Sequence, residues 1–162
     1  MRRGCSNDDL LPPFLVRDAA NMTIVELRTE AEWREAFPVM RELRMHLDET
    51  GFLALLAVMM PAGYRLLAAR EGDRIVAVAG IAVRTSLHHG RHVWVYDLVT
   101  TADARSRGYG RALLSAIEDL GRHEDCETIA LSSGLQRTDA HRFYEKHMGY
   151  ERASYSFRKA LR

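Results

Sequence analysis

One stretch of this chain, from Tyr96 to Glu118, reads as a strand, a glycine-containing loop and an amphipathic helix. The loop is Arg105-Ser106-Arg107-Gly108-Tyr109-Gly110, and Arg111 follows it. The first N–H groups of a helix have no partner within it and carry partial positive charge, so a phosphate binds there favourably. The two glycines lack side chains that would keep a diphosphate from these amides, and the three arginines add positive charge. The stretch therefore predicts a phosphate-binding loop.

Two familiar nucleotide motifs do not match this loop. A dinucleotide fingerprint needs a third glycine where Leu113 stands, and the lysine-containing P-loop pattern is absent from the chain. From the local sequence alone, the alternative to a phosphate site is a glycine-rich turn with a few solvated arginines.

A second landmark lies further along, where residues 140–150 read A-H-R-F-Y-E-K-H-M-G-Y. Together the two segments resemble the motifs of the GNAT superfamily of N-acetyltransferases, [QR]-x-x-G-x-[GA] and A-x-x-F-Y-x-K-x-G-[FY]. The second segment carries one extra residue before its glycine. The resemblance covers roughly residues 22–162 and leaves residues 1–21 outside it.

The length of 162 residues suits one domain, which we place at residues 22–162. Residues 1–21 have no helical or strand period and contain Pro12-Pro13, which predicts a flexible leader. The alternative is an arm that packs on a neighbouring subunit.

Periodicity predicts an element order of β α α β β β α β α β. The expected strands are 23–28, 64–70, 75–83, 93–99, 128–132 and 153–158, and the helices are 30–47, 49–60, 109–123 and 138–148. A polar loop is expected over residues 84–91. The resemblance implies an α/β fold of the mixed α+β kind, with about six to seven strands and about four helices. Gly80, inside a strand, indicates a bulge or a close approach.

Acetyl transfer from a thioester to an amine needs a neutral amine, a donor for the oxyanion and a proton for the departing thiolate. The resemblance implies that Tyr144 is the general acid, since a tyrosine with a pKa of about 10 is protonated at neutral pH. The alternative is a core residue beside Phe143. Asp97 is the best candidate for the base, with Tyr96 and Glu26 as weaker ones. A capping or substrate-orienting role for the Asp97 carboxylate is the equal alternative. Tyr96 and Asp97 point opposite ways unless a bulge intervenes.

The resemblance also implies how acetyl-CoA is held. The backbone of Leu98, Val99 and Thr100 would pair with the pantetheine arm, the amides of Arg105 to Arg111 would hold the pyrophosphate, and Phe143 would pack along the cofactor. The link between the first two helices, around His46, Asp48, Glu49 and Phe52, would border the acceptor. Two positions depart from the family pattern: Ala102 replaces a frequent Pro, and Arg137 replaces a frequent Asn.

Composition excludes several kinds of partner. A net charge of +1 predicts neither nucleic-acid nor membrane binding, and no apolar run approaches the roughly 20 residues of a membrane span. His88, His89 and His92 have no carboxylate or cysteine at ligand spacing, so we predict no metal. Two cysteines without C-x-x-C spacing favour a reducing cytoplasm.

The sequence therefore predicts an acetyl-CoA-dependent N-acetyltransferase that acts on a primary amine of a small molecule or peptide. Neither motif contains a cysteine that could carry the acetyl group, which favours direct attack in a ternary complex. The alternative is a non-catalytic acyl-CoA-binding or sensing module. By family analogy, a homodimer is expected, with the last strand at its interface.

Overall fold

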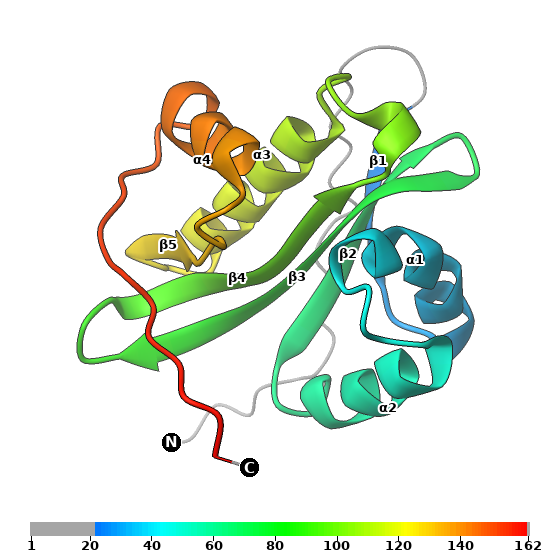
Figure 1. The fold of residues 1–162 in the computed structure, drawn as a ribbon, viewed down its shortest axis with the longest axis horizontal. Helices are drawn as coiled ribbons and strands as arrows, with labels where there is room; N and C mark the ends of the chain where they lie inside the picture. The colour runs from blue at the N-terminus through cyan, green and yellow to red at the C-terminus, as the bar shows by residue number, and fades with distance from the viewer. Residues whose placement is uncertain (1–21, 162) are drawn as a thin grey trace, which may run out of the picture.

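A five-stranded mixed sheet forms the centre of the computed structural model, which describes residues 22–161 (Figure 1). The strands lie in sequence order, antiparallel from β1 to β4, and β5 runs parallel to β4. They are β1 Met22–Leu27, β2 Tyr64–Glu71, β3 Arg74–Ser86, β4 Gly90–Thr100 and β5 Thr128–Leu131. The predicted leader, residues 1–21, lies outside the described residues. No helix within residues 22–161 has the length and apolar character to cross a membrane.

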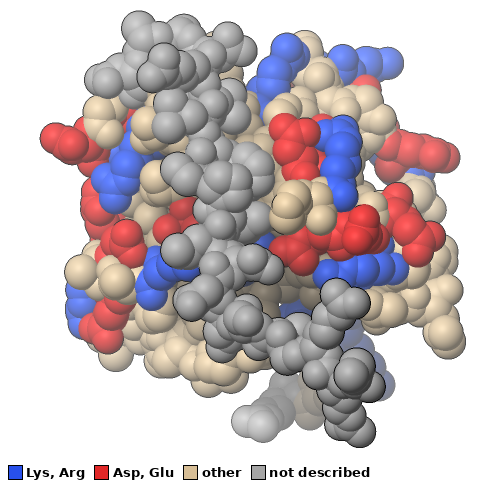
Figure 2. Space-filling model, turned by 180° about the vertical axis from the view of Figure 1, so that it is seen from behind, with Lys and Arg blue, Asp and Glu red and all other residues tan. Residues whose placement is uncertain are grey.

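Helices cover both faces of the sheet (Figure 1). One core lies between the sheet and the first two helices, and the other lies under α3 and the segment after α4. The helices are α1 Glu30–Leu43, α2 Glu49–Met59, α3 Tyr109–His123 and α4 Thr138–Arg142, with a 3₁₀ turn η1 Ala102–Ala104 and a π-helical turn η2 Phe143–His147. On the face in Figure 2, acidic and basic side chains are interspersed rather than gathered by sign.

Local sequence explains where the first helices begin. Thr29 caps α1 in a capping box: its hydroxyl accepts from the Glu32 amide at 3.3 Å, and the Glu32 carboxylate accepts from the Thr29 amide at 2.8 Å. Asp48 caps α2 by accepting from the Gly51 amide at 2.7 Å. The helix expected over 30–47 ends at Leu43, because the chain turns between residues 44 and 48.

A β-bulge interrupts the pairing of β3 with β4, as Gly80 predicted. Gly80 pairs with Asp97 and Ile81 pairs with Val95, so Tyr96 is the extra residue. Both Tyr96 and Asp97 consequently lie on the face that α1 and α2 cover.

Gly80 also allows a close approach of the Tyr64 ring. A Cβ added to Gly80 would lie 1.7 Å from the Tyr64 hydroxyl oxygen. We expect Gly80→Ala to destabilise the fold by about 2 kcal/mol, because the buried ring has to shift. Thermal unfolding would show this as a fall in Tm of roughly 4–8 °C. Tyr64→Leu in the same chain removes the clashing atoms, so the double variant should recover part of the loss. An unchanged Tm in the single variant would contradict the packing seen here.

Two further sequence expectations are wrong. The polar loop predicted over 84–91 is a tight hairpin, because β3 runs to Ser86 and β4 starts at Gly90, with Arg84 still paired to His92. The predicted strand 153–158 is irregular, and the side chains of Tyr155 and Phe157 are 75% and 92% exposed. Alternation indicates a strand only where a neighbouring strand accepts its hydrogen bonds, and among residues 22–161 none pairs with this segment. The sheet accordingly has five strands rather than six to seven.

Candidate active site

The edge of β4 opens where β5 ends. Only His92–Val95 of β4 pair with β5. Residues 96–100 of β4 therefore extend beyond the end of β5. The Thr101 amide donates to the Val76 carbonyl at 2.9 Å, on the side of β3. Because the backbone groups alternate along a strand, those of Leu98 and Thr100 point to the open edge and those of Val99 point to β3. Of the three residues predicted to pair with a pantetheine arm, two therefore have backbone groups directed toward this edge.

The predicted phosphate loop follows the open edge directly. Gly108 is the N-cap of α3 with φ of 90°, a left-handed conformation that favours glycine, and no side chain caps this helix. The first helical bond runs from the Ala112 amide to the Gly108 carbonyl. The amides of residues 109–111 thus have no carbonyl within the helix, and they are the groups a phosphate would use.

Gly110 brings three elements together at the start of α3. A Cβ added there would lie 3.3 Å from the Thr100 hydroxyl oxygen and 4.0 Å from the Phe143 ring. The end of β4, the loop and η2 therefore converge at one place, as expected if all three contact one cofactor.

The loop arginines are not free cations. Arg105 donates to the Glu42 carboxylate at 3.1 Å and to the Thr100 carbonyl at 3.2 Å. Arg107 pairs with Glu71 and lies over the Tyr109 ring, 5.2 Å from its centre. The Tyr109 side chain is buried, and its hydrogen bond to Glu71 raises the pKa of its hydroxyl. Tyr109 can therefore offer a phosphate only its backbone amide.

Tyr144 lies in the π-helical turn η2, half-buried beside two other rings. The ring centres of Phe143 and Tyr150 are 5.3 Å and 5.9 Å from that of Tyr144. Burial raises the pKa of Tyr144, while the positive charge of Arg137 lowers it in part. The net rise keeps the hydroxyl protonated at neutral pH, and a protonated hydroxyl can donate. Arg137, at the N-cap of α4, thus acts on the electrostatics of this tyrosine.

Asp97 belongs to a hydrogen-bonded group that the sequence did not reveal. It is 9% exposed, and it accepts from Arg44 Nε at 2.7 Å and from the Tyr64 hydroxyl at 3.0 Å. Arg44 also donates to the Tyr96 carbonyl at 3.0 Å. Burial and the neighbouring Asp97 raise the pKa of Tyr64 strongly, so this hydroxyl stays a donor. The only sequence signal for the group was Gly80, which makes room for Tyr64.

The link between α1 and α2 contributes Arg44 to this site. Of the residues expected to border the acceptor, Asp48 caps α2, Glu49 pairs with Arg34, and Phe52 is buried in the core. The contacts of these three residues are structural. Of the four residues expected to border the acceptor, His46 alone has an exposed side chain without a structural contact of this kind.

A row of aromatic rings leads along β4 toward Asp97. The ring centres are 5.1 Å apart for His89 and His92, 6.4 Å for His92 and Trp94, and 6.4 Å for Trp94 and Tyr96. Desolvation, followed by the charges of His88 and His92, lowers the pKa of His89. Within residues 22–161, no group of three or more His, Cys, Asp or Glu side chains could hold a metal ion.

The two predicted catalytic residues lie on opposite faces of β4. Asp97 bonds to the group under α1 and α2, whereas Tyr144 packs against the core under α3. No hydrogen bond joins them in the described part of the chain.

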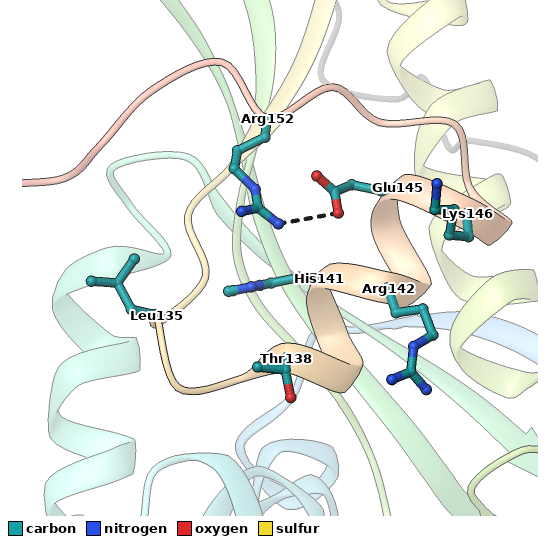
Figure 3. Close-up of a pocket in the computed structure, with 7 residues that line it drawn as sticks. All are labelled: Leu135, Thr138, His141, Arg142, Glu145, Lys146 and Arg152. Atoms are coloured by element: carbon teal, nitrogen blue, oxygen red, sulfur yellow. Dashed lines mark hydrogen bonds and ion pairs between the residues drawn. The ribbon is translucent and has the colours of Figure 1, made fainter.

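A cavity of about 410 Å³ lies elsewhere, on the outer side of α4 and η2 (Figure 3). Its lining is rich in basic side chains, and Arg152 pairs with Glu145 across it at 3.1 Å. The lining residues are Leu135, Thr138, His141, Arg142, Glu145, Lys146 and Arg152. None of them is a residue that the sequence assigned to the site.

The fold matches that of solved acetyltransferases. Among solved structures, the chain is similar to the aminoglycoside N-acetyltransferase AAC(6')-Iy in complex with CoA, with a TM-score of 0.78 and 16% identity. The alignment covers 91% of this chain and 99% of that one. At this identity the likeness establishes the fold alone.

The model of the Acetyltransferase (GNAT) family matches residues 26–150, and the chain belongs to this family. It is 47% identical over 137 residues to the Uncharacterized N-acetyltransferase YhdJ of Bacillus subtilis (strain 168), covering 84% of this chain and 96% of that protein. It is 32% identical over 121 residues to the Aminoalkylphosphonate N-acetyltransferase of Salmonella typhimurium (strain LT2), covering 74% and 76%. The resemblance stated from the two motifs is confirmed.

Proposed function

We propose that this acetyltransferase moves the acetyl group of acetyl-CoA to a primary amine by direct attack in a ternary complex. The observation that carries the proposal is the uncapped N-terminus of α3, with Gly108 and Gly110, beside the open edge of β4. This arrangement offers backbone amides to a diphosphate and strand-like hydrogen bonds to an amide-containing arm.

The cofactor would lie across elements that already converge. Amides of residues 105–111 hold the pyrophosphate, the backbone of Leu98 and Thr100 pairs with the pantetheine arm, and Phe143 packs along it. Acetyl-CoA supplies the thioester that is broken. Arg105 and Arg107 would have to leave their ion pairs with Glu42 and Glu71 to reach a phosphate, whereas the first amides of α3 have no partner within the helix.

Tyr144 acts on the leaving thiolate, and Asp97 acts on the acceptor amine. The bound ammonium first releases a proton to solvent, and the neutral amine then attacks the thioester carbon. The C–S bond breaks as the thiolate takes the hydroxyl proton of Tyr144. The acetylated nitrogen loses its remaining extra proton to solvent, and Tyr144 regains a proton from solvent. Arg44 donates to one oxygen of the Asp97 carboxylate and Tyr64 to the other, which fixes the orientation of the carboxylate and leaves acceptor positions open. This favours the orienting role over the base, so we propose that Asp97 binds the acceptor amine.

The acceptor is a small organic amine in this proposal. Aromatic rings beside a carboxylate suit an ammonium group with an apolar body, because the ring faces attract cations. The name of the Salmonella relative, an aminoalkylphosphonate acetyltransferase, supports a small amine and suggests aminoalkyl acids as the first acceptors to screen.

Thermal unfolding with CoA, acetyl-CoA and NADH side by side tests the cofactor half of the proposal. At 100 times its dissociation constant, CoA should stabilise the fold by about 2.7 kcal/mol. For a domain of this size that is a rise in Tm of roughly 5–11 °C. NADH should give no shift. Gly110→Val is the negative control. Its side chain would fill the space between Thr100 and Phe143, so CoA should not raise the Tm of this variant. No shift with CoA, or an equal shift with NADH, would remove the basis for the proposal.

A further inference from the structure

Glu42, in the last turn of α1, holds the connection between β4 and α3. Its carboxylate accepts from the Thr101 hydroxyl at 2.6 Å, from the Ala102 amide at 3.0 Å and 3.2 Å, and from Arg105 Nη2 at 3.1 Å. All three donors lie about sixty residues further along the chain. One side chain therefore ties α1 to three consecutive parts of this connection.

The connection that Glu42 holds is the first part of the predicted phosphate site. Thr101 and Ala104 are buried, at 8% and 1% exposure, and the 3₁₀ turn η1 lies between the strand and the loop. The N-terminus of η1 has no side-chain cap of its own. Instead, the carboxylate of Glu42, which lies on α1, caps this turn. A negative charge at a helical N-terminus is favourable.

Arg105 extends this contact to the open edge of β4. Its Nη2 donates to Glu42 while its Nε donates to the carbonyl of Thr100. Glu42, Arg105 and Thr100 thus form a closed link between α1, the loop and the strand edge. Loss of Glu42 would release both the η1 amide and the Arg105 side chain.

We propose that Glu42 is a positioning residue for cofactor binding, which orders the β4–α3 connection so that the amides of residues 105–111 are in place before CoA arrives. A loop that is ordered in advance binds more tightly, because less backbone freedom is lost on binding. This inference rests on the proposed function, since it assumes that CoA occupies the loop. Nothing in it requires Glu42 to touch the cofactor.

Calorimetric titration of CoA into Glu42→Ala and Glu42→Gln tests the inference. We expect the Kd to rise about tenfold in Glu42→Ala, with kcat at saturating acetyl-CoA within about twofold of the parent, as loss of preorganisation predicts. Glu42→Gln keeps the size of the side chain and should show a smaller rise. Glu35→Ala is the matched control, because Glu35 also lies on α1 and pairs with a strand residue, Arg70, at 2.6 Å. It should leave the Kd unchanged.

Ala102→Pro supplies a rescue that a purely structural role of Glu42 would not show. Thr101 has ψ of 145°, which a following proline accepts, and Ala102 is the first residue of η1, where proline is favoured. Proline removes the amide that Glu42 binds but fixes the backbone covalently. In the Glu42→Ala background, Ala102→Pro should therefore restore most of the CoA affinity, and amide exchange of residues 103–105 should slow again.

The possible outcomes distinguish a failure of this inference from a failure of the proposed function. If the parent protein binds no CoA, the proposed function fails. If the parent binds CoA and Glu42→Ala binds it equally well, only the inference fails. A Kd that rises in Glu42→Ala and stays high after Ala102→Pro also overturns it, because ordering of the connection would then not be the cause. If Glu42→Ala does not fold, the same readings are taken on Glu42→Gln.

Discussion

Replacement of Tyr144 by phenylalanine is expected to lower kcat about 10²- to 10⁴-fold, the usual contribution of a positioned general acid. The variant loses only the hydroxyl, and the ring keeps its packing against Phe143 and Tyr150. CoA should bind with an unchanged Kd, because the phosphate loop and the open edge of β4 are untouched. Steady-state rates and calorimetry on the same preparations separate the two effects.

Tyr150→Phe is the matched control for this variant. Tyr150 belongs to the same group of rings, and its hydroxyl donates to Glu118 at 3.2 Å rather than to the open edge. We expect a loss of about 1 kcal/mol in the free energy of unfolding and no large change in kcat. If Tyr144→Phe retained kcat within threefold, the chain would bind acetyl-CoA without using Tyr144 as its acid.

The pH dependence of kcat follows from the direction of the shift at Tyr144. Burial raises its pKa, and the charge of Arg137 offsets this only in part. The protonated hydroxyl is the active form, so activity falls only as the pH rises through the raised pKa. A rate limited by this proton should therefore stay level on the alkaline side up to about pH 10, the ordinary value for tyrosine.

Asp97→Asn is expected to lower kcat/KM for the acceptor amine roughly 10- to 100-fold, which corresponds to the 1.5–3 kcal/mol of a hydrogen bond to a charged group. The loss should appear mainly as a higher KM, and the shape of the pH profile should not change. Those results identify an orienting carboxylate. A fall in kcat with a flattened acid limb would instead make Asp97 the base.

Asp103→Asn controls for the loss of a carboxylate near the site. Asp103 lies in η1, is exposed, and pairs with Arg74 at 2.7 Å, whereas Asp97 is buried and bonds to Arg44 and Tyr64. Acceptor kinetics should be unchanged in this variant. A comparable loss in both variants would mean that a general electrostatic effect explains the Asp97 result.

The glycine-containing turn before α3 and the helices could be predicted because their signals are local. Glycines at the start of α3, the capping residues Thr29 and Asp48 and the apolar stripes each act within a few residues of sequence. The bulge at Tyr96 could be predicted from Gly80, since a glycine inside a strand marks either a bulge or a close approach, and here it marks both.

The contacts that complete the site could not be read from the sequence. Arg44 and Asp97 are 53 residues apart, and Glu42 and Ala102 are 60 apart, so only the fold brings each pair together. From the sequence alone, charged residues such as Glu42 and Arg44 cannot be distinguished from solvent-exposed positions on a helix. The prediction of a strand over 153–158 was wrong for the opposite reason. Its local alternation is clear, but no strand within residues 22–161 pairs with it.

The π-helical turn explains how the extra residue before Gly149 is accommodated. The Met148 amide donates to the Phe143 carbonyl at 3.2 Å, five residues back, and Gly149 then takes a left-handed φ of 72°. A wide turn takes up one residue without rotating the helix before it. A residue could thus be removed from this wide turn without changing the register of α4, which ends at Arg142 before it.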